Sequence, residues 1–566
     1  MIDRPQKKWR LKAQGEPNRI QKMKSIIGEK YGPLSEILIQ RGFNTLNDIL
    51  NWTPGVSIYS IDPMQMVDMP IASNRLLLAK KNRETIFIFG DYDVDGTTAV
   101  STMSLALKRG GWRILTYIPD RYLEGYGLSK KGIDNAVENG ASVLITLDCG
   151  IKANELVDYA NQRGLDVIVT DHHTPGQILP SAVAVINPKR KDCPFPHKEL
   201  SGCGVGYMLC RAVYKAGKLD VSELDTLMDL VAVSIGADMV PLTGINRFIV
   251  KKGLDIMNND PRPSISALLG VKKEGLVTLQ DVVFAIGPKI NAAGRMGHGH
   301  LAVDLLTTPN PKLLEELGLE IENHNLKRRA TEKMVSLNAI KLAVKLKDDI
   351  ALILVGKEWH KGVLGIVAQR MVEHFHKPTI VLTEHDGILT GSARSVPGLN
   401  IYNSIDEASE HLIQFGGHHA AAGITLNPND LDSFRAAFNL SVNKNWAMNQ
   451  REPEQLIDTS AQPEDLNDSL CSLLEKLEPF GMGNESPVWG LYKVTMEKTT
   501  YMTSDKHLKT FLTNPISGAQ IPAIGFGWGE FRPENRLVNA AVILEWNYFR
   551  GQRQRQARII DLQNAN

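Results

Sequence analysis

The chain has 566 residues, of which 43% are hydrophobic and 22% charged, and its formal net charge is +1. This is the composition of an ordinary globular protein, and the length exceeds what one hydrophobic core supports, so three or four domains are expected. No stretch approaches the ~18 uninterrupted apolar residues of a membrane span, and no apolar segment follows the basic N-terminus. Five cysteines without a Cys-x-x-Cys pair disfavour a disulfide framework and a zinc ribbon, and fit a protein of the reducing cytoplasm.

Positive charge is concentrated at the two ends of the chain. Residues 1–31 carry nine Lys or Arg against three acids, and residues 550–558 carry four arginines and no acid. Basic ends favour a nucleic acid over a small metabolite as the partner. Solvated basic tails are an equally good interpretation at this point.

Residues 84–188 alternate apolar strands with helices across short connections. A glycine stands just beyond each predicted helix, where it ends helices. Such a βαβ series predicts a right-handed, doubly wound parallel sheet. The predicted strands are 85–89, 113–118, 143–147, 167–170 and 182–186, and the predicted helices are 97–109, 129–139 and 152–163.

Three of these strands end in acidic residues or histidines. The carboxyl ends of parallel strands share one edge of a sheet, where ligands bind. Five carboxylates and two imidazoles at one edge repel one another unless cations lie among them, which predicts two divalent metal ions and phosphoester chemistry. A further acid, Asp238, follows the apolar run 231–235. The residues at the strand ends are Asp91, Asp93, Asp95, Asp148, Asp171, His172 and His173.

The first acidic cluster also has the spacing of the start of a calcium-binding EF-hand loop. That loop requires a helix before it and a Glu at its twelfth position. Here a strand precedes the cluster and position twelve is Met103, so an EF-hand is excluded. A solvated acidic turn is the remaining alternative, and two packed or surface histidines are the alternative for His172 and His173.

The second half of the chain divides into three parts. Residues 311–348 predict one long helix, and strand patterns at 350–355 and 379–382 predict a small α/β domain. After Pro453 the segments are short, β-rich and separated by turns, as in a small barrel such as an OB-fold. The predicted division is an N-terminal helical and basic extension (1–70), a sheet domain (71–310), a connecting helix (311–348), a small α/β domain (349–450) and a barrel (451–566).

Ten short segments of the chain resemble segments of one known family. Residues 91–96, 146–150, 170–173 and 237–242 resemble, in order, the four signature segments of the DHH phosphoesterases. Residues 124–128, 287–295, 359–366, 391–395, 416–423 and 478–484 are similar to the bacterial branch of that family that degrades single-stranded DNA. The resemblance runs from about residue 35 to the C-terminus. It implies a DHH domain, a DHHA1 domain and an OB-fold.

The resemblance also implies roles for the residues at the strand ends. In the family, two Mn²⁺ or Mg²⁺ ions activate a water molecule that attacks phosphorus in line, so no side-chain nucleophile is expected. Asp91 stands where smaller relatives carry a histidine, His173 matches the residue beside the scissile phosphate, and Asp171 is expected to orient the histidines. The residues that match metal ligands are Asp93, Asp95, Asp148, His172 and Asp238.

Other matched residues are expected to bind the substrate. Ser392, Arg394 and Arg295 match residues that hold a 5′-terminal phosphate, and Arg121 is a weaker candidate of the same kind. His418 lies in the segment 416–423, whose glycines and alanines would admit a nucleotide backbone. A tight turn leading into a packed helix is the alternative for this segment.

Near the C-terminus, Arg553 and Arg555 alternate along a predicted strand and therefore face one side of it. With Trp546 and Tyr548 upstream, they predict a charged track with stacking surfaces for single-stranded nucleic acid. In the alternative interpretation Trp546 is a core residue and the arginines lie on a solvated edge.

Together these features predict a cytoplasmic, monomeric 5′→3′ exonuclease that releases 5′-mononucleotides from single-stranded DNA in repair and recombination. A helicase and a single-strand-binding protein are candidate partners. One alternative is a DHH phosphodiesterase for short RNA or cyclic dinucleotides, which the ~110 residues after Pro453 argue against. The other is a non-catalytic single-strand clamp, which should have lost metal ligands.

Overall fold

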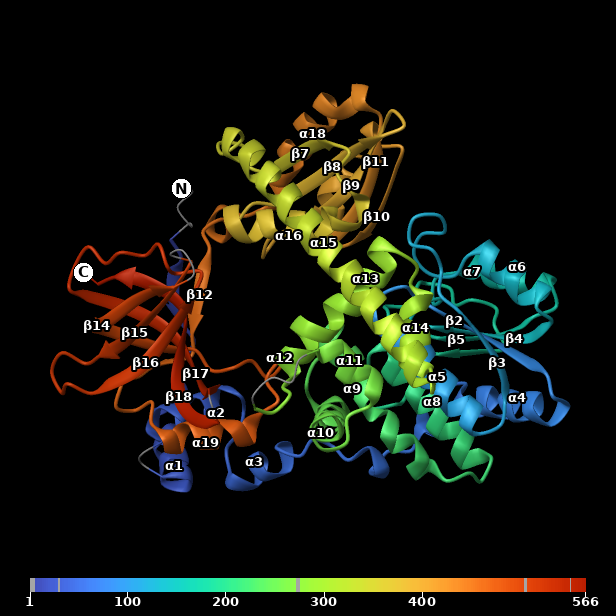
Figure 1. The fold of residues 1–566 in the computed structure, drawn as a ribbon, viewed down its shortest axis with the longest axis horizontal. Coiled ribbons are helices and arrows are strands. Elements are labelled where there is room, and N and C mark those ends of the chain that lie inside the picture. Colours follow the sequence, from blue (N-terminus) through green and yellow to red (C-terminus); the bar gives the residue numbers. More distant parts are fainter. Residues whose placement is uncertain (1–5, 29–30, 271–274, 503–505, 550, 566) are drawn as a thin grey trace.

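The computed structural model describes the chain except for residues 1–5, 29–30, 271–274, 503–505, 550 and 566. Figure 1 shows a sheet domain at the right, a small α/β domain at the top and a barrel at the left. Within the described residues, every helix is too short or too polar to serve as a membrane span.

The basic N-terminal segment is folded onto the barrel. Its strand β1 (Lys8–Leu11) pairs in parallel with β12 (Glu454–Ile457). Buried residues of the following helices, among them Met23 and Leu34, belong to the same hydrophobic core as the barrel strands. The described part of this segment is therefore not a free basic tail. Its helices are α1 (Pro17–Ile27), α2 (Gly32–Gln40) and α3 (Leu46–Trp52).

The sheet domain contains a five-stranded parallel sheet in the order β3-β2-β4-β5-β6, which confirms the predicted doubly wound architecture. Helices cover both faces, with α6 and α7 on one side and α4, α5 and α8 on the other (Figure 1). The strands are β2 (Thr85–Gly90), β3 (Arg113–Tyr117), β4 (Ala141–Leu147), β5 (Asp166–Thr170) and β6 (Ala184–Ile186). The helices are α4 (Met69–Asn82), α5 (Val94–Arg109), α6 (Lys130–Glu138), α7 (Asn154–Gln162) and α8 (Gly202–Ala216).

A helical subregion completes this domain. The apolar run 231–235 lies in helix α9 (Met228–Ala237), so Asp238 follows a helix and not a strand. The predicted connecting helix is α15 (Pro311–Lys345). The remaining helices are α10 (Gly244–Asn259), α11 (Pro263–Leu269), α12 (Leu279–Asp281), α13 (Gly287–Met296) and α14 (His300–Thr307).

The small α/β domain has a five-stranded sheet in the order β10-β11-β9-β8-β7, in which only β7 and β8 are parallel. Residues 416–423 form the hairpin between β10 and β11, so the alternative of a turn entering a helix is wrong. The strands are β7 (Leu352–Lys357), β8 (Thr379–His385), β9 (Ile388–Arg394), β10 (Gln414–His418) and β11 (Ala421–Leu426), and the helices are α16 (Lys361–Phe375), α17 (Ile401–Asp406) and α18 (Leu431–Asn445).

The C-terminal lobe is the predicted barrel. Its sheet has the order β13-β14-β15-β16-β18-β17, and pairing of β14 with β17 closes the ring. Helix α19 (Asp468–Leu477), which was not predicted, lies beside it. The strands are β13 (Thr459–Ser460), β14 (Trp489–Met502), β15 (His507–Thr513), β16 (Gln520–Phe526), β17 (Leu537–Phe549) and β18 (Gln552–Asn564).

A buried arginine joins the barrel lobe to the sheet domain. Arg247 of α10 is 0% exposed, and its guanidinium donates hydrogen bonds to the carbonyl oxygens of Leu477 and Glu478. It also donates to the carbonyl oxygen of Thr53 and lies 3.9 Å from the ring centre of Trp52. This contact fixes the start of the 478–484 segment against the sheet domain.

Candidate metal centre

The predicted acidic residues meet at the point where the strand order of the parallel sheet reverses. Asp91 follows β2 and Asp148 follows β4, and these neighbouring strands flank the reversal, where ligands bind in such sheets. Asp148 has a left-handed backbone (φ 62°), and its amide donates to the carbonyl oxygen of Thr170. Gly202, at the start of α8, packs so closely that an added Cβ would lie 2.5 Å from Cβ of Asp148.

The side chains form three overlapping groups whose potential ligand atoms lie within 4.8 Å of one another. The structure therefore brings together every residue predicted to ligate metal, and it adds Asp91 and His173. The groups are Asp91 with Asp93 and Asp148, Asp95 with His172 and Asp238, and Asp148 with His172 and His173.

The donor atoms fit divalent cations. Asp91 Oδ2, Asp148 Oδ1 and His172 Nε2 are buried and have no hydrogen-bond partner among the described residues. Nδ1 of His172 lies 2.9 Å from the carbonyl oxygen of Leu200, and as the donor there it leaves Nε2 with a free lone pair. Nε2 lies 3.2 Å from Asp148 Oδ1 and 3.7 Å from Asp238 Oδ2. Buried carboxylate and imidazole atoms left bare in this way are the ligands that Mn²⁺ and Mg²⁺ sites use.

The pKa values of the clustered carboxyl groups also indicate that cations bind here. Burial, followed by repulsion from Asp95 and Asp93, raises the pKa of Asp148 well above its usual range. Burial, followed by repulsion from Asp93, likewise raises the pKa of Asp91 well above its usual range. Burial and Asp95 raise the pKa of Asp238 to about 8. A divalent cation among these carboxylates would reverse the repulsion.

Asp171 and His173 form a fixed pair at the rim of this cluster. Asp171 Oδ1 accepts hydrogen bonds from the amides of His172 and His173 and lies 2.7 Å from Nδ1 of His173. Burial raises the pKa of Asp171, but the bonds from His173 and the backbone outweigh it, so the pKa is lowered. The same contact raises the pKa of His173 against the effect of its burial. Asp171 is thus placed where it can orient His173, as the prediction for it requires.

Tyr126 is a residue of this site that sequence reasoning did not single out. Its hydroxyl lies 3.3 Å from Nε2 of His173 and 3.4 Å from the carbonyl oxygen of Asp148. The segment 124–128 contributed to the family resemblance, but nothing in its spacing assigns a contact to the tyrosine.

Three of the predicted substrate-binding arginines gather beside the centre. Arg295 donates to the carbonyl oxygen of Gly362 (2.9 Å), and burial followed by repulsion from Arg121 lowers its pKa to about 9. Burial and then Arg121 also lower the pKa of Arg394, and Arg121 lies 4.0 Å from the ring centre of Tyr92. None of the three has an ion-pair partner within the described ranges. Arg121 also lies within electrostatic reach of Asp91 and Asp93. Arginines that repel one another and form no ion pair are typical of a site that binds an anion.

Ser392 lies on β9 with Arg394, and His418 lies at the end of β10, two strands away in the same sheet. Ser392 precedes Arg394 by two residues on β9, and a Cβ added to Gly365 of α16 would lie 3.5 Å from its Oγ and 2.7 Å from Nη2 of Arg394. Burial, and then the charges of His419, Arg394 and His173, lower the pKa of His418. The β10–β11 hairpin therefore lies within electrostatic reach of the centre.

The structure does not bring Arg553 and Arg555 to this centre. Arg553 lies 3.9 Å from the ring centre of Trp546, and it pairs with Glu475 of α19 at 2.7 Å. Arg555 pairs with Asp468 of the same helix at 2.6 Å, and Trp546 packs against the barrel core. These contacts favour the alternative in which Trp546 is a core residue and the arginines lie on a solvated edge, and the acids of α19 pair with both arginines.

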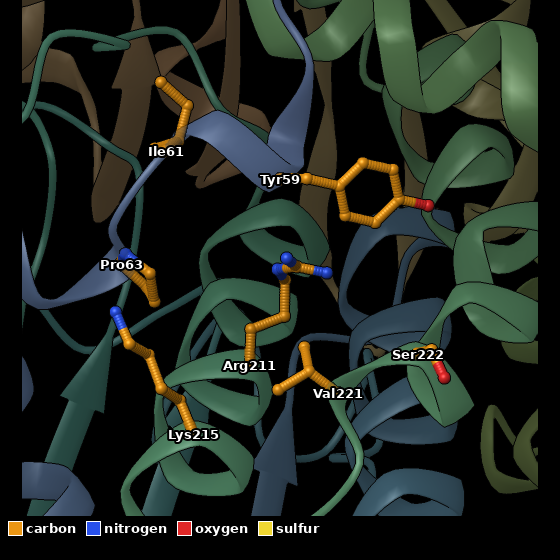
Figure 2. Close-up of a pocket in the computed structure, with 7 residues that line it drawn as sticks. All are labelled: Tyr59, Ile61, Pro63, Arg211, Lys215, Val221 and Ser222. Atoms are coloured by element: carbon orange, nitrogen blue, oxygen red, sulfur yellow. The ribbon is translucent and has the colours of Figure 1, made fainter.

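A pocket of about 260 Å³ lies between residues 59–63 and helix α8 (Figure 2). It contains none of the predicted site residues. Its lining consists of Tyr59, Ile61, Pro63, Arg211, Lys215, Val221 and Ser222.

Comparisons with known proteins agree with this arrangement. The chain matches the models of the DHH family, N-terminal domain (residues 85–235), the DHHA1 domain (347–444) and the RecJ OB domain (457–561). It is 35% identical to the single-stranded-DNA-specific exonuclease RecJ of Bacillus subtilis over 93% of this chain and 68% of that protein. It is 32% identical to the protein of the same name from Dickeya dadantii over 92% of this chain and 94% of that one.

The fold is similar to a crystal structure of RecJ from Thermus thermophilus in complex with Mn²⁺. The TM-score is 0.82 at 25% sequence identity, over 99% of this chain and 80% of that one. A structure of the same protein in complex with Mg²⁺ has a TM-score of 0.76 at 24% identity. With its three matched domains and its identity to curated relatives over nearly its whole length, the chain belongs to the RecJ family of DHH proteins.

Proposed function

We propose that this chain is a metal-dependent exonuclease that degrades single-stranded DNA from the 5′ end and releases 5′-mononucleotides. The observation that carries the proposal is the set of bare, buried ligand atoms of Asp91, Asp148 and His172. They lie at the edge of a parallel sheet whose relatives are single-stranded-DNA-specific exonucleases.

Two groups of residues would hold the ions. Asp91, Asp93 and Asp148 form one position, and Asp95, His172 and Asp238 form the other, with Asp148 Oδ1 3.2 Å from His172 between them. Two divalent ions bound there acidify water and neutralise the charge on the phosphoryl oxygens. The assignment of Asp91 as a ligand goes beyond its role in the family resemblance and follows from its position in the first group.

The protein's own residues position the scissile phosphate. Asp171 accepts from Nδ1 of His173, which places Nε2 of the imidazole beside the hydroxyl of Tyr126. A histidine with a raised pKa can carry a proton toward a phosphoryl oxygen and stabilise its negative charge. The phenol of Tyr126 fixes the same ring from the other side.

The 5′→3′ polarity is supported by the arginine cluster. Arg121, Arg295 and Arg394 repel one another and lack ion-pair partners among the described residues, so a terminal phosphate would relieve their repulsion. A guanidinium binds phosphate oxygens through two parallel hydrogen bonds. A phosphate held there would mark the end of the strand and set the distance to the scissile bond.

The five-part division of the chain (1–70, 71–310, 311–348, 349–450 and 451–566) is part of the proposal. It is supported by separate hydrophobic cores for the sheet domain, the small α/β domain and the barrel. The N-terminal helices share the barrel core, so the extension and the barrel form one lobe. We propose that this lobe guides the strand toward the centre and that the enzyme acts as a cytoplasmic monomer.

The test uses two single-stranded oligonucleotides, one labelled at each end, with Mn²⁺ or Mg²⁺. The 5′ label should leave first as a mononucleotide, and chelation with EDTA should stop the reaction. The Asp148→Ala variant should be inactive, whereas Asp134→Ala, which removes a partly exposed aspartate on α6, should keep full activity. Early loss of the 3′ label would contradict the polarity, and activity in EDTA or in Asp148→Ala would contradict the metal mechanism.

Hydrolysis of short RNA or cyclic dinucleotides in preference to DNA would favour the phosphodiesterase alternative. DNA binding without cleavage at any metal concentration would favour the non-catalytic clamp. The complete ligand set argues against the clamp, because a protein that only binds a strand has no use for the six converging ligands of the two ion positions.

A further inference from the structure

We propose that Ser234 is a positioning residue of the metal centre: its hydroxyl fixes Asp95 so that this carboxylate offers one oxygen lone pair to one ion. The inference rests on the proposed metal centre. Ser234 lies in α9 and is not among the residues that the sequence predicted.

Asp95 is held by three hydrogen-bond donors from two different helices. It lies in the first turn of α5 and is 2% exposed. Its Oδ2 accepts from the amide of Gly202 (2.6 Å), and its Oδ1 accepts from the amide of Cys203 (2.7 Å) and from Oγ of Ser234 (2.6 Å).

These contacts leave Asp95 one free lone pair. An ionised carboxylate has about four acceptor sites, two on each oxygen. Both sites of Oδ1 and one site of Oδ2 are taken by the three donors. The remaining site is on Oδ2, which lies 3.8 Å from Nε2 of His172. Asp95 can therefore bind one ion, the one held together with His172 and Asp238, through a single oxygen. It cannot bridge two ions.

The direction of the Ser234 hydrogen bond is fixed by Asp95 itself. Oγ of Ser201 lies 2.6 Å from Oγ of Ser234 and accepts from the amide of Gly204 at the start of α8. Ser234 has one hydroxyl proton and two acceptors within reach, and the ionised carboxylate of Asp95 is the stronger acceptor, so the proton points to Asp95. Both serines are 0% exposed, so water does not compete with this chain of hydrogen bonds.

Two residues one turn apart at the end of α9, Ser234 and Asp238, both act on the same ion position. Ser234 and Asp238 are four residues apart, and the amide of Asp238 donates to the carbonyl oxygen of Ser234 at 2.9 Å. The turn that orients Asp95 therefore also ends at the second carboxylate of that position. The other position, with Asp91, Asp93 and Asp148, receives no hydrogen bond from Ser234. Ser234 should thus affect one ion and spare the other.

The test compares Ser234→Ala with the wild-type chain in a titration with Mn²⁺ without DNA, followed by isothermal calorimetry and by the electron paramagnetic resonance signal of free Mn²⁺. One of two binding events should weaken by about 10- to 100-fold, the effect typical of losing a residue that orients a metal ligand. The other should keep its affinity. Ser234→Thr, which retains the hydroxyl, should restore most of the lost affinity, and nuclease activity should follow it at limiting Mn²⁺.

Ser104→Ala is the matched control. Ser104 lies on α5 with Asp95 and is 1% exposed, but its hydroxyl has no hydrogen-bond partner in the described structure. This variant should bind both ions as the wild type does. The thermal unfolding of each variant in EDTA separates loss of fold from loss of metal.

Unchanged affinity for both ions in a folded Ser234→Ala variant would overturn the inference, as would equal weakening of both ions. Absence of Mn²⁺ binding to the wild-type chain is a different result, because it would overturn the proposed metal centre itself.

Discussion

Nε2 of His172 lies 3.2 Å from Oδ1 of Asp148, and both atoms are buried without a hydrogen-bond partner in the described part of the chain. Burial lowers the pKa of His172, and its Nδ1 is already engaged with the carbonyl oxygen of Leu200, so the neutral ring turns a lone pair toward the carboxylate. Two acceptors at this distance repel each other unless a cation lies beside both. This contact ties the two ion positions together through Asp148.

Replacing Asp148 should therefore have a larger effect than replacing a ligand that belongs to a single group, such as Asp238. Asp148 belongs to two of the three ligand groups, whereas Asp238 belongs to one. We expect Asp148→Asn to weaken both Mn²⁺ binding events and to reduce nuclease activity by more than about 100-fold, beyond the range for residues that only orient ligands. Calorimetry with Mn²⁺ measures the first effect and a labelled oligonucleotide the second. Two ions bound at wild-type affinity in this variant would refute the shared role.

The stability of the metal-free protein should fall as pH rises. Asp238 has a folded-state pKa of about 8 against 3.8 for an ordinary aspartate, because of burial and Asp95. The folded state then holds a proton that the unfolded state has released, so the contribution of Asp238 to stability is fully present below pH ~4 and is lost as pH rises toward 8. In EDTA the unfolding temperature should decrease between pH 6 and pH 8.5, and excess Mn²⁺ should reverse the decrease, most strongly at high pH. Asp238→Asn should make the slope in EDTA shallower, and an unfolding temperature in EDTA that rises with pH would contradict the assignment.

The pair of Asp171 and His173 gives a prediction for the pH profile of the reaction. Asp171 raises the pKa of His173 through the 2.7 Å contact with Nδ1. In Asp171→Asn the pKa of His173 should fall, and the limb of the rate profile that reports this group should move to lower pH. Activity should drop about 10- to 100-fold because the ring loses its fixed orientation. The matched control is Asp158→Asn, an exposed aspartate on α7, which should leave the profile unchanged. A pH–rate profile of unaltered shape in Asp171→Asn would show that His173 does not take part in the reaction.

Much of the centre could be predicted from the sequence because its residues follow strands with a clear apolar pattern. Asp91, Asp148 and Asp171 each stand directly after a buried strand of one parallel sheet, so their convergence follows from topology. Asp238 was found by the same pattern, although the apolar run before it is a buried helix. A short, fully apolar run has no periodicity that separates a helix from a strand.

The contacts that depend on tertiary packing could not be predicted. Ser234 meets Asp95 only because α8 and α9 pack against the start of α5, and no local pattern encodes that meeting. Arg553 and Arg555 alternate on β18 as expected, but α19 supplies carboxylates to both. That helix was not predicted, and without it the two arginines resembled an open basic track.

The arginine cluster predicts a dependence on the 5′ phosphate. Arg394 lies beside Ser392 on β9 and is repelled by Arg121, so a terminal phosphate should bind it strongly. Hydrogen bonds to charged groups contribute about 1.5–3 kcal/mol, so Arg394→Met should lower the preference for 5′-phosphorylated over 5′-hydroxyl oligonucleotides by about 10-fold or more. Arg435→Met, which removes an arginine bound to the carbonyl oxygen of Ile353 in the same domain, is the control. An unchanged preference in Arg394→Met would place the 5′ end elsewhere.

The junction between the barrel lobe and the sheet domain should depend on Arg247. Its guanidinium satisfies carbonyl oxygens from residues 477–479 and from Thr53, and burial lowers its pKa to about 10. Arg247→Met keeps the volume but leaves several buried carbonyl oxygens unpaired, each at a cost of about 1–3 kcal/mol. We expect a lower unfolding temperature and faster proteolysis near residues 477–484, while Mn²⁺ binding at the sheet edge is unchanged, because the ligands lie on other elements. Arg10→Met, which removes an exposed arginine paired with Glu454, should change neither. If Arg247→Met resisted proteolysis as well as the wild type, the lobes would be held together by their apolar contacts alone.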